Sequence, residues 1–372
     1  MTIEAPGTKS EDTRLTAARR APAASSIVNT TCIDPLSDLA WDRLAAAHPD
    51  FTFFHSSAWA KVLHSTYGHE PVYHRFYRGD QLAAMLPMME VRSPLTGRRG
   101  VCLPFTDSCG PLYFGSNEPS QAVMDHLVRT SHERSWKYFE VRGKGAHLPD
   151  AHPSVSFYNH ILGLRGSADD LFDQFASPVR RAIRKAEQHG VVTETSTDLD
   201  ALLEFYRLHI QTRRRHGLPP QPISFFRNIH EHVLKARLGF VVLARHESRP
   251  VAGAVFFHSG KKAIYKFGAS DASQQELRGN NLTMWQGIKT LAQRGFATLD
   301  FGRTSLANDG LRRFKQSWGV EEKVVEYSKY DALRKTWVTS QDKASGFHNT
   351  IFRALPTPLN RLAGTLLYLH LD

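Results

Sequence analysis

The chain has 372 residues, with 47 Lys or Arg against 36 Asp or Glu, which gives a formal net charge of +11. Its 41% hydrophobic and 22% charged residues are typical of a soluble globular protein, and its length predicts two domains or one duplicated unit. No uncharged apolar run reaches the roughly 18 residues of a membrane-spanning helix. Three cysteines are too few for a disulfide framework and indicate a reducing, cytoplasmic compartment.

The first part of the chain is predicted to hold a disordered leader and an N-terminal lobe. Residues 1–30 are rich in Ala, Ser and Thr and show no apolar period, and they lack the apolar stretch of a secretory signal. The lobe, residues 31–165, is then predicted in chain order as helices at 38–47 and 57–65, strands at 71–77 and 81–92, a helix at 120–135 and a strand at 136–141.

The second part of the chain repeats this order. Residues 166–345 are expected to form a C-terminal lobe, with strands at 240–245, 251–258 and 263–268, a helix at 281–294 and a strand at 297–301. Two helices precede these strands, at 177–189 and 198–215. Both halves therefore contain an antiparallel hairpin, a helix and a further strand, which favours a duplication and an α+β fold.

Cations gather in three places: residues 180–185, 213–215 and 312–315. Such clusters suit an anionic partner such as a phosphate, a nucleic acid or an acidic lipid, although a solvated basic surface without a partner explains them as well. Metal binding is not expected, because the 19 histidines are scattered and no metal or nucleotide motif occurs.

The most informative segment is 299–319, where a buried strand ends at Asp300 and a basic helical run follows. Polar groups at the end of a strand are well placed for a ligand site. Arg303 and Lys315 would hold a phosphate or stabilise an oxyanion there. The alternative is a structural ion pair between Asp300 and Arg303 on a solvated surface.

Two further segments hold polar residues among apolar neighbours. Lys266 follows Tyr265 in the strand predicted at 263–268. The favoured interpretation is that the aliphatic part of its side chain is buried and its ammonium group faces the solvent. Asp107 lies in a loop bounded by proline and glycine, which favours an ordinary turn aspartate over a general base.

Four segments resemble the FemAB-type transferases, and more closely their branch found with exosortase and exopolysaccharide loci. They are TRRRHGLPPQP from residue 212, YKFGAS from 265, NNLTMWQGIKTLAQRGFATLDFGRTS from 280 and GLRRFKQSWG from 310. The resemblance extends over about residues 50 to 360. It implies two tandem GNAT-like lobes, each a mixed, mostly antiparallel sheet flanked by helices, and transfer of an acyl or aminoacyl group onto an amine.

The resemblance also implies roles for single residues. Catalytic roles fall to Lys315, Asp300 and Asp107. Substrate contacts fall to a further set of polar residues: Arg303, Ser305, Tyr265, Lys266, Arg213, Arg312 and Arg313. The place of the CoA-pyrophosphate motif is taken by residues 276–281, which gives a donor-binding set of Arg278, Gly279 and Asn281.

The partners follow from the same resemblance. The donor is a co-substrate and no cofactor is tightly bound, with aminoacyl-tRNA and acyl-CoA both open; the acceptor is an amine on a cell-envelope or exopolysaccharide precursor. The amphipathic tail, residues 346–372, either docks on the protein body or meets the inner membrane peripherally. Two other functions stay open: a CoA-dependent N-acetyltransferase, and a non-catalytic module that binds an anionic polymer.

Overall fold

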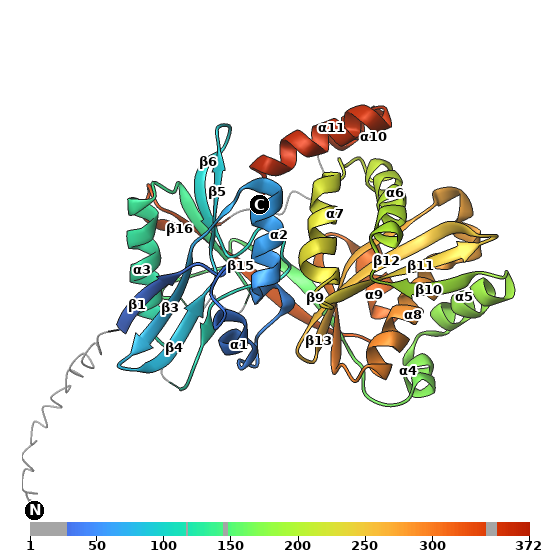
Figure 1. Cartoon of the computed structure of the whole chain (residues 1–372), viewed down its shortest axis with the longest axis horizontal. Coiled ribbons are helices and arrows are strands. Elements are labelled where there is room, and N and C mark those ends of the chain that lie inside the picture. The colour runs from blue at the N-terminus through green and yellow to red at the C-terminus, as the bar shows by residue number, and fades with distance from the viewer. Residues whose placement is uncertain (1–27, 117, 144–147, 340–347) are drawn as a thin grey trace, which may run out of the picture.

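The structure, a computed structural model, describes residues 28–116, 118–143, 148–339 and 348–372. Residues 1–27 of the predicted leader lie outside the described residues. Its last three residues, 28–30, belong to strand β1 (Val28–Ile33). The described strands form one four-stranded sheet and one twelve-stranded sheet, and helices pack against both (Figure 1). The predicted α+β class is therefore confirmed.

The N-terminal half divides its strands between the two sheets. Its elements after β1 are α1 (Trp41–Ala46), η1 (Phe53–His55), α2 (Ser57–Tyr67), β2 (Glu70–Pro71), β3 (Tyr73–Arg78), β4 (Gln81–Leu86), β5 (Met89–Ser93), β6 (Gly97–Val101), β7 (Leu112–Tyr113), α3 (Ser120–Glu133) and β8 (Tyr138–Arg142). The prediction of one strand over 81–92 is wrong, because β4 and β5 lie in different sheets. The break falls at Pro87, which has no N–H to continue a ladder.

The C-terminal half is longer and more regular. It begins with β9 (Val155–Gly163), α4 (Ala168–Gln174), α5 (Ser177–Gln188), β10 (Val192–Ser196), α6 (Leu199–Arg215), α7 (Ile223–Ile229) and η3 (His230–Leu234). It continues with β11 (Gly239–His246), β12 (Arg249–Ser259), β13 (Lys262–Ser270), η4 (Ala272–Leu277), α8 (Gly279–Gln293), β14 (Thr298–Ser305), α9 (Asp309–Gln316), β15 (Glu321–Asp331) and β16 (Thr336–Val338). The tail forms α10 (His348–Ala354), α11 (Thr357–Leu367) and η5 (Tyr368–His370).

The large sheet runs through both halves in the order β10-β11-β12-β13-β14-β9-β15-β8-β6-β5-β2, with β16 beside β15. Two of its described pairs are parallel, β6 with β8 and β13 with β14, and each is connected through a helix, α3 or α8. This repeated unit agrees with the duplication read from the sequence. Strand β15 pairs with both β8 and β9, so the halves share one continuous sheet and a lobe boundary at residue 165 stays a prediction.

Aromatic side chains join the two halves. The ring of Trp59 on α2 lies 5.8 Å from that of Phe225 on α7, and the ring of Phe53 lies 4.7 Å from that of Phe257 on β12. These four side chains are almost completely buried. Burying such rings stabilises a contact by about 1.5–3 kcal/mol per side chain, which fixes the halves relative to each other.

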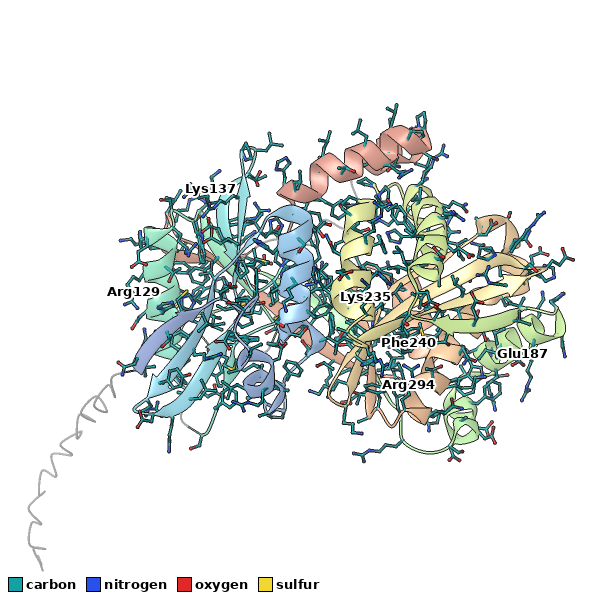
Figure 2. All side chains as sticks on the ribbon, viewed as in Figure 1. Arg129, Lys137, Glu187, Lys235, Phe240 and Arg294 are labelled. Atoms are coloured by element: carbon teal, nitrogen blue, oxygen red, sulfur yellow. The ribbon has the colours of Figure 1, made fainter. Side chains whose placement is uncertain are left out.

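A second core lies between α5, α8 and the strands of the C-terminal half. At its border the guanidinium of Arg294 lies 5.0 Å from the ring centre of Phe240, and both residues are labelled in Figure 2. None of the described helices is long and apolar enough to cross a membrane.

Candidate active site

The site begins where two parallel strands part. Pairing between β13 and β14 runs from Lys262 and Thr298 to Ile264 and Asp300 and stops there. Strand β14 then has an irregularity before it resumes pairing with β9 at Arg303. This break in the ladder frees backbone groups of β14 to bind side chains instead of a neighbouring strand.

Gly302 sits inside the irregularity with φ of 74°, a conformation that glycine adopts without strain. A Cβ atom at this position would lie 3.3 Å from a carboxylate oxygen of Asp107. The glycine thus permits both the backbone turn and the close approach of the Asp107 loop.

Lys315 reaches this irregularity from α9. Its residue is only 4% exposed, and its Nζ donates to the carbonyl oxygens of Gly302 at 2.7 Å and Arg303 at 3.1 Å. Burial lowers the pKa of Lys315 to about 8, although Asp107 and Asp300 act to raise it. An ammonium group has three donors, and the two carbonyls use two of them, so one N–H can serve a ligand.

Helix α9 is fixed on the N-terminal side of Lys315 by two sets of contacts. The side chain of Asn308 accepts a hydrogen bond from the Leu311 N–H at 3.0 Å and caps the helix. Arg312 binds Glu322 of β15 through two hydrogen bonds of 2.9 and 2.6 Å. These contacts hold the helix against β14 and β15.

Asp107 and Lys266 form a mostly buried ion pair between the two halves. The Lys266 Nζ lies 3.1 Å from Asp107 Oδ2 and donates to the Phe105 carbonyl at 2.7 Å, and its side chain is 10% exposed. The ammonium also lies 4.7 Å from the ring centre of Phe54. The interpretation of Lys266 as an outward-facing side chain is therefore wrong, because the loop of the other half covers it.

The charge state of the pair follows from its surroundings. Burial acts to raise the pKa of Asp107, but the charges of Lys266 and Arg303 outweigh it and lower that pKa. The Arg303 N–H adds a hydrogen bond of 3.3 Å to Asp107 Oδ1. Burial lowers the pKa of Lys266 in spite of the opposing effect of Asp107. Asp107 is therefore an ionised carboxylate, and its contacts with Lys266 and with the Arg303 N–H hold the Asp107 loop against β13 and β14.

Asp300 is the carboxyl group in the cluster that takes up a proton most easily. Burial raises its pKa to about 6, and the negative charge of Asp107 adds to this rise. Its two oxygens accept hydrogen bonds from the Gly302 N–H at 2.7 Å and from Asn159 Nδ2 at 3.1 Å. Because each oxygen has a second lone pair, Asp300 can still accept a proton from a ligand.

Three residues at the site belong to no sequence motif, and the sequence did not predict them as site residues: Asn159, Arg142 and Tyr327. The Tyr327 hydroxyl donates to the Asp107 carbonyl at 2.9 Å, and the Arg142 guanidinium lies 5.2 Å from the Tyr327 ring centre. Arg303 covers the same wall, 4.4 Å from the ring centre of Phe157. Only the pairing of β15 with β8 and β9 brings these residues together, and a local pattern gives no signal for it.

Other predicted residues lie around the cluster or away from it. The Tyr265 ring packs between Phe256 and Phe301, and burial raises its pKa to about 12. The Ser305 hydroxyl accepts from the Ala307 N–H at 3.4 Å at the end of β14. These contacts are structural, and substrate roles for both residues stay predictions.

The three predicted basic residues differ in their surroundings. Arg313 is exposed on α9, whereas Arg312 is held by Glu322 and stacks on Tyr158 at 4.0 Å. Arg213 turns to the tail, where it donates to the Tyr368 hydroxyl at 2.7 Å. The structure therefore does not bring Arg213 to Lys315, and its side chain holds the C-terminal segment.

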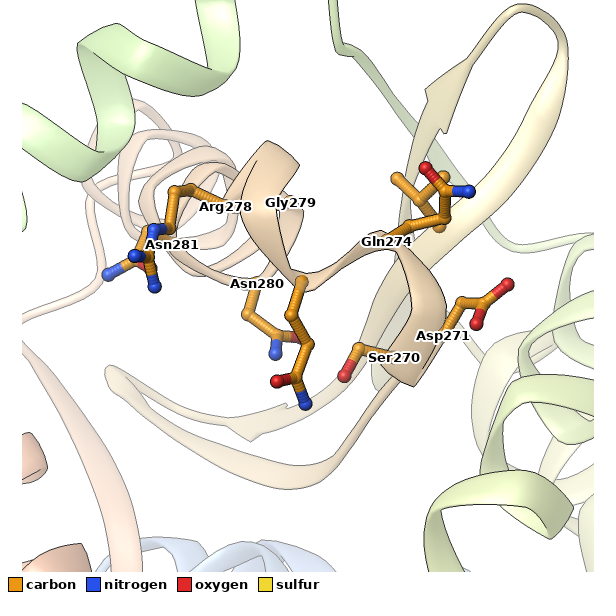
Figure 3. A pocket seen from close by; sticks show the side chains of 9 residues that line it. Ser270, Asp271, Gln274, Arg278, Gly279, Asn280 and Asn281 are labelled. Carbon is orange, nitrogen blue, oxygen red and sulfur yellow. The ribbon is translucent and has the colours of Figure 1, made fainter.

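A small hollow lies at the start of α8. It measures about 120 Å³ and is lined by Arg278, Gly279, Asn281 and nearby residues of η4 (Figure 3). Gly279 packs closely on β12, since a Cβ there would lie 3.1 Å from Val251. The predicted donor-binding set is thus gathered at one helix start.

A larger groove of about 780 Å³ joins this hollow to α9, and we call it the basic groove. Its lining comes from three helices: Pro178, Val179, Arg181, Ala182, Arg184, Lys185 and Gln188 of α5, Arg278 and Asn281 at α8, and Phe314 and Ser317 at α9. Phe314 faces this groove while the next residue, Lys315, faces the cluster. The cluster and the groove therefore lie on two sides of α9.

Residues 174–316 match the sequence model of the acetyltransferase (GNAT) domain. None of the curated proteins matches the chain. The crystal structure of FemX aligns with a TM-score of 0.60 and 16% identity, covering 80% of this chain and 96% of that one.

A tandem GNAT protein from the clavulanic acid biosynthesis pathway aligns with a TM-score of 0.55 and 11% identity, over 82% of this chain and 99% of that one. At such low identity these likenesses concern the fold, which confirms the tandem GNAT-like architecture predicted from the sequence. The chain therefore shares the fold of FemX and of a tandem GNAT protein, and its residues 174–316 match the GNAT domain.

Proposed function

We propose that the protein transfers an acyl or aminoacyl group from an activated, phosphate-bearing donor to an amine. The observation that carries this proposal is Lys315, a buried ammonium whose two described hydrogen bonds go to backbone carbonyls, beside Asp300 at the break between β13 and β14. The GNAT match over residues 174–316 includes Asp300 and Lys315, which supports the same class of reaction.

The reaction needs one group that stabilises the developing negative charge and one group that accepts a proton. The amine nitrogen attacks the donor carbonyl carbon, and the negative charge that develops on the carbonyl oxygen is stabilised by the remaining N–H of Lys315. Asp300, ionised above a pH of about 6, takes the proton that the amine loses. The C–O or C–S bond to the donor then breaks, and the leaving alkoxide or thiolate takes up the proton that Asp300 accepted, which returns Asp300 to its ionised form.

The basic groove is the proposed place for the donor phosphates. Arg181, Arg184, Lys185 and Arg278 line it, and guanidinium and ammonium groups bind phosphate oxygens without base recognition. Phe314, 38% exposed, gives a surface for an adenine ring. Acyl-CoA and the 3′ end of aminoacyl-tRNA share this chemistry, so both are donors to test. The acceptor is proposed as an amine of a cell-envelope or polysaccharide precursor, which rests on the sequence resemblance.

Thermal-shift titrations with acetyl-CoA and with a pool of charged tRNA test donor binding, because a ligand that binds the native state raises the melting temperature. Mass spectrometry of amine acceptors incubated with each donor then tests transfer. A donor that shifts the melting temperature but is never consumed would support a binding module for anionic polymers and refute the transferase.

Variants separate catalysis from folding. Lys315→Met is expected to lower turnover by about 10²–10³-fold, the usual loss for one oxyanion donor. Lys235→Met, on an exposed side chain directly after η3, makes the same exchange away from the cluster and should leave turnover unchanged. Equal turnover in wild type and a folded Lys315→Met protein would remove Lys315 from the reaction.

A further inference from the structure

A row of exposed leucines lies on the outer face of α11 and of η5 directly after it, and we call it the C-terminal ridge: Leu359, Leu362, Leu366 and Leu369. Steps of three, four and three residues place these side chains on one side of the helix. The first three are 52%, 55% and 56% exposed. Several large apolar side chains that gather in water on one face mark a contact site.

The opposite face of the helix already serves to attach it to the protein. Asn360 is completely buried, and the position of a Cβ on Gly364 lies 1.9 Å from the Pro220 carbonyl oxygen, so the two backbones touch. Tyr368 is buried and its hydroxyl accepts a hydrogen bond from Arg213. The C-terminal ridge is therefore not needed to hold α11 in place.

A second element of the N-terminal half contributes to the same side of the molecule. The hairpin of β5 and β6 rises beside α11 (Figure 1), and Leu95 at its tip is 73% exposed. Arg99 of β6 fixes the two elements together, since it donates to the His370 carbonyl at 2.8 Å and to Asp372 at 2.9 Å. Leu95 and the C-terminal ridge thus present apolar side chains in one fixed arrangement.

The charged side chains within α10 and α11 are positive. Arg353 and Arg361 are exposed, and no ion pair with a carboxylate is found for either among the described residues, although Arg361 contacts the Tyr206 hydroxyl through a hydrogen bond. Residues 343–371 contain no Asp or Glu. A second copy of the chain would bring the same arginines against each other, which disfavours a symmetric dimer through this face.

We propose that the C-terminal ridge, with Leu95, docks the protein on an anionic phospholipid surface. The leucines enter the boundary between headgroups and acyl chains, and the two arginines bind lipid phosphates. A hollow of about 340 Å³, lined in part by Arg361 and Leu362, gives room for a headgroup at the edge of the ridge. This docking does not depend on the proposed transfer reaction.

Sedimentation of the full chain with lipid vesicles tests the proposal. Binding is expected to vesicles that contain phosphatidylglycerol, to weaken with added salt, and to be much weaker for pure phosphatidylcholine. Leu362→Glu/Leu366→Glu should lower the partition coefficient by about tenfold or more. Arg361→Gln should lower it by about fivefold, the effect of one cation near the surface.

The matched control is Val192→Glu/Leu333→Glu, which adds the same charge at side chains 64% and 79% exposed outside the ridge. Its vesicle binding should clearly exceed that of the ridge variant. Equal binding of the two double variants, or equal binding of wild type to both kinds of vesicle, would overturn the proposal. So would a lipid-independent dimer in light scattering that only the ridge variant abolishes.

Discussion

We expect the ion pair between Asp107 and Lys266 to be one of the main tertiary contacts that stabilise the site. Lys266→Met keeps an unbranched side chain and removes the charge, which leaves the Asp107 carboxylate mostly buried without its ammonium partner. Two unit charges 3.1 Å apart attract by roughly 5 kcal/mol at an effective dielectric constant of 20, an upper limit because burial opposes both charges. We expect the single variant to lose about 3–5 kcal/mol of unfolding free energy.

A double-mutant cycle isolates the pair itself. Asp107→Asn and the double variant complete the cycle, and urea unfolding followed by fluorescence and circular dichroism gives the four free energies. The double variant should lose less than the two single losses together, with a coupling energy of about 1–3 kcal/mol.

The chain offers a matched pair on its surface. The side chains of Glu231 and Lys235 are 2.6 Å apart and about half exposed. A cycle of Glu231→Gln and Lys235→Met should give a coupling energy of about 0.3–0.5 kcal/mol. A coupling energy for Asp107 and Lys266 no larger than that of the surface pair would refute the reasoning that burial strengthens the contact between the halves.

The remaining predictions concern the cluster around β14. Turnover should rise as the pH passes about 6, where Asp300 ionises, and fall as it passes about 8, where Lys315 loses its proton; Asp300→Asn should remove the acidic limb of a pH–rate profile. Gly302→Ala should cost about 1–3 kcal/mol in urea unfolding because alanine is strained at this positive φ, and an unchanged midpoint would contradict the need for glycine at this position. Glu322→Gln should lower the melting temperature at neutral pH. Since the Arg312 hydrogen bond lowers the pKa of Glu322, that difference should vanish as the pH falls well below the usual value of 4.5.

The sequence by itself predicted α5, α6 and α8 and the basic helix that carries Lys315. Apolar periodicity predicted α8 and α6 within a few residues, because helix formation depends on neighbours three and four positions away. The basic helix that carries Lys315 also followed from local pattern, whereas the prediction that the strand ends at Asp300 is wrong, because β14 continues to Ser305. The repeated order of elements indicated the tandem fold.

Only the tertiary structure decided which groups meet. Asp107 and Lys266 are 159 residues apart in the chain, so no local pattern could show that one covers the other. The same holds for Tyr327, which reaches the Asp107 loop because β15 pairs across both halves. Contacts of this range arise from sheet order and burial, and these also set the pKa values of Asp300 and Lys315.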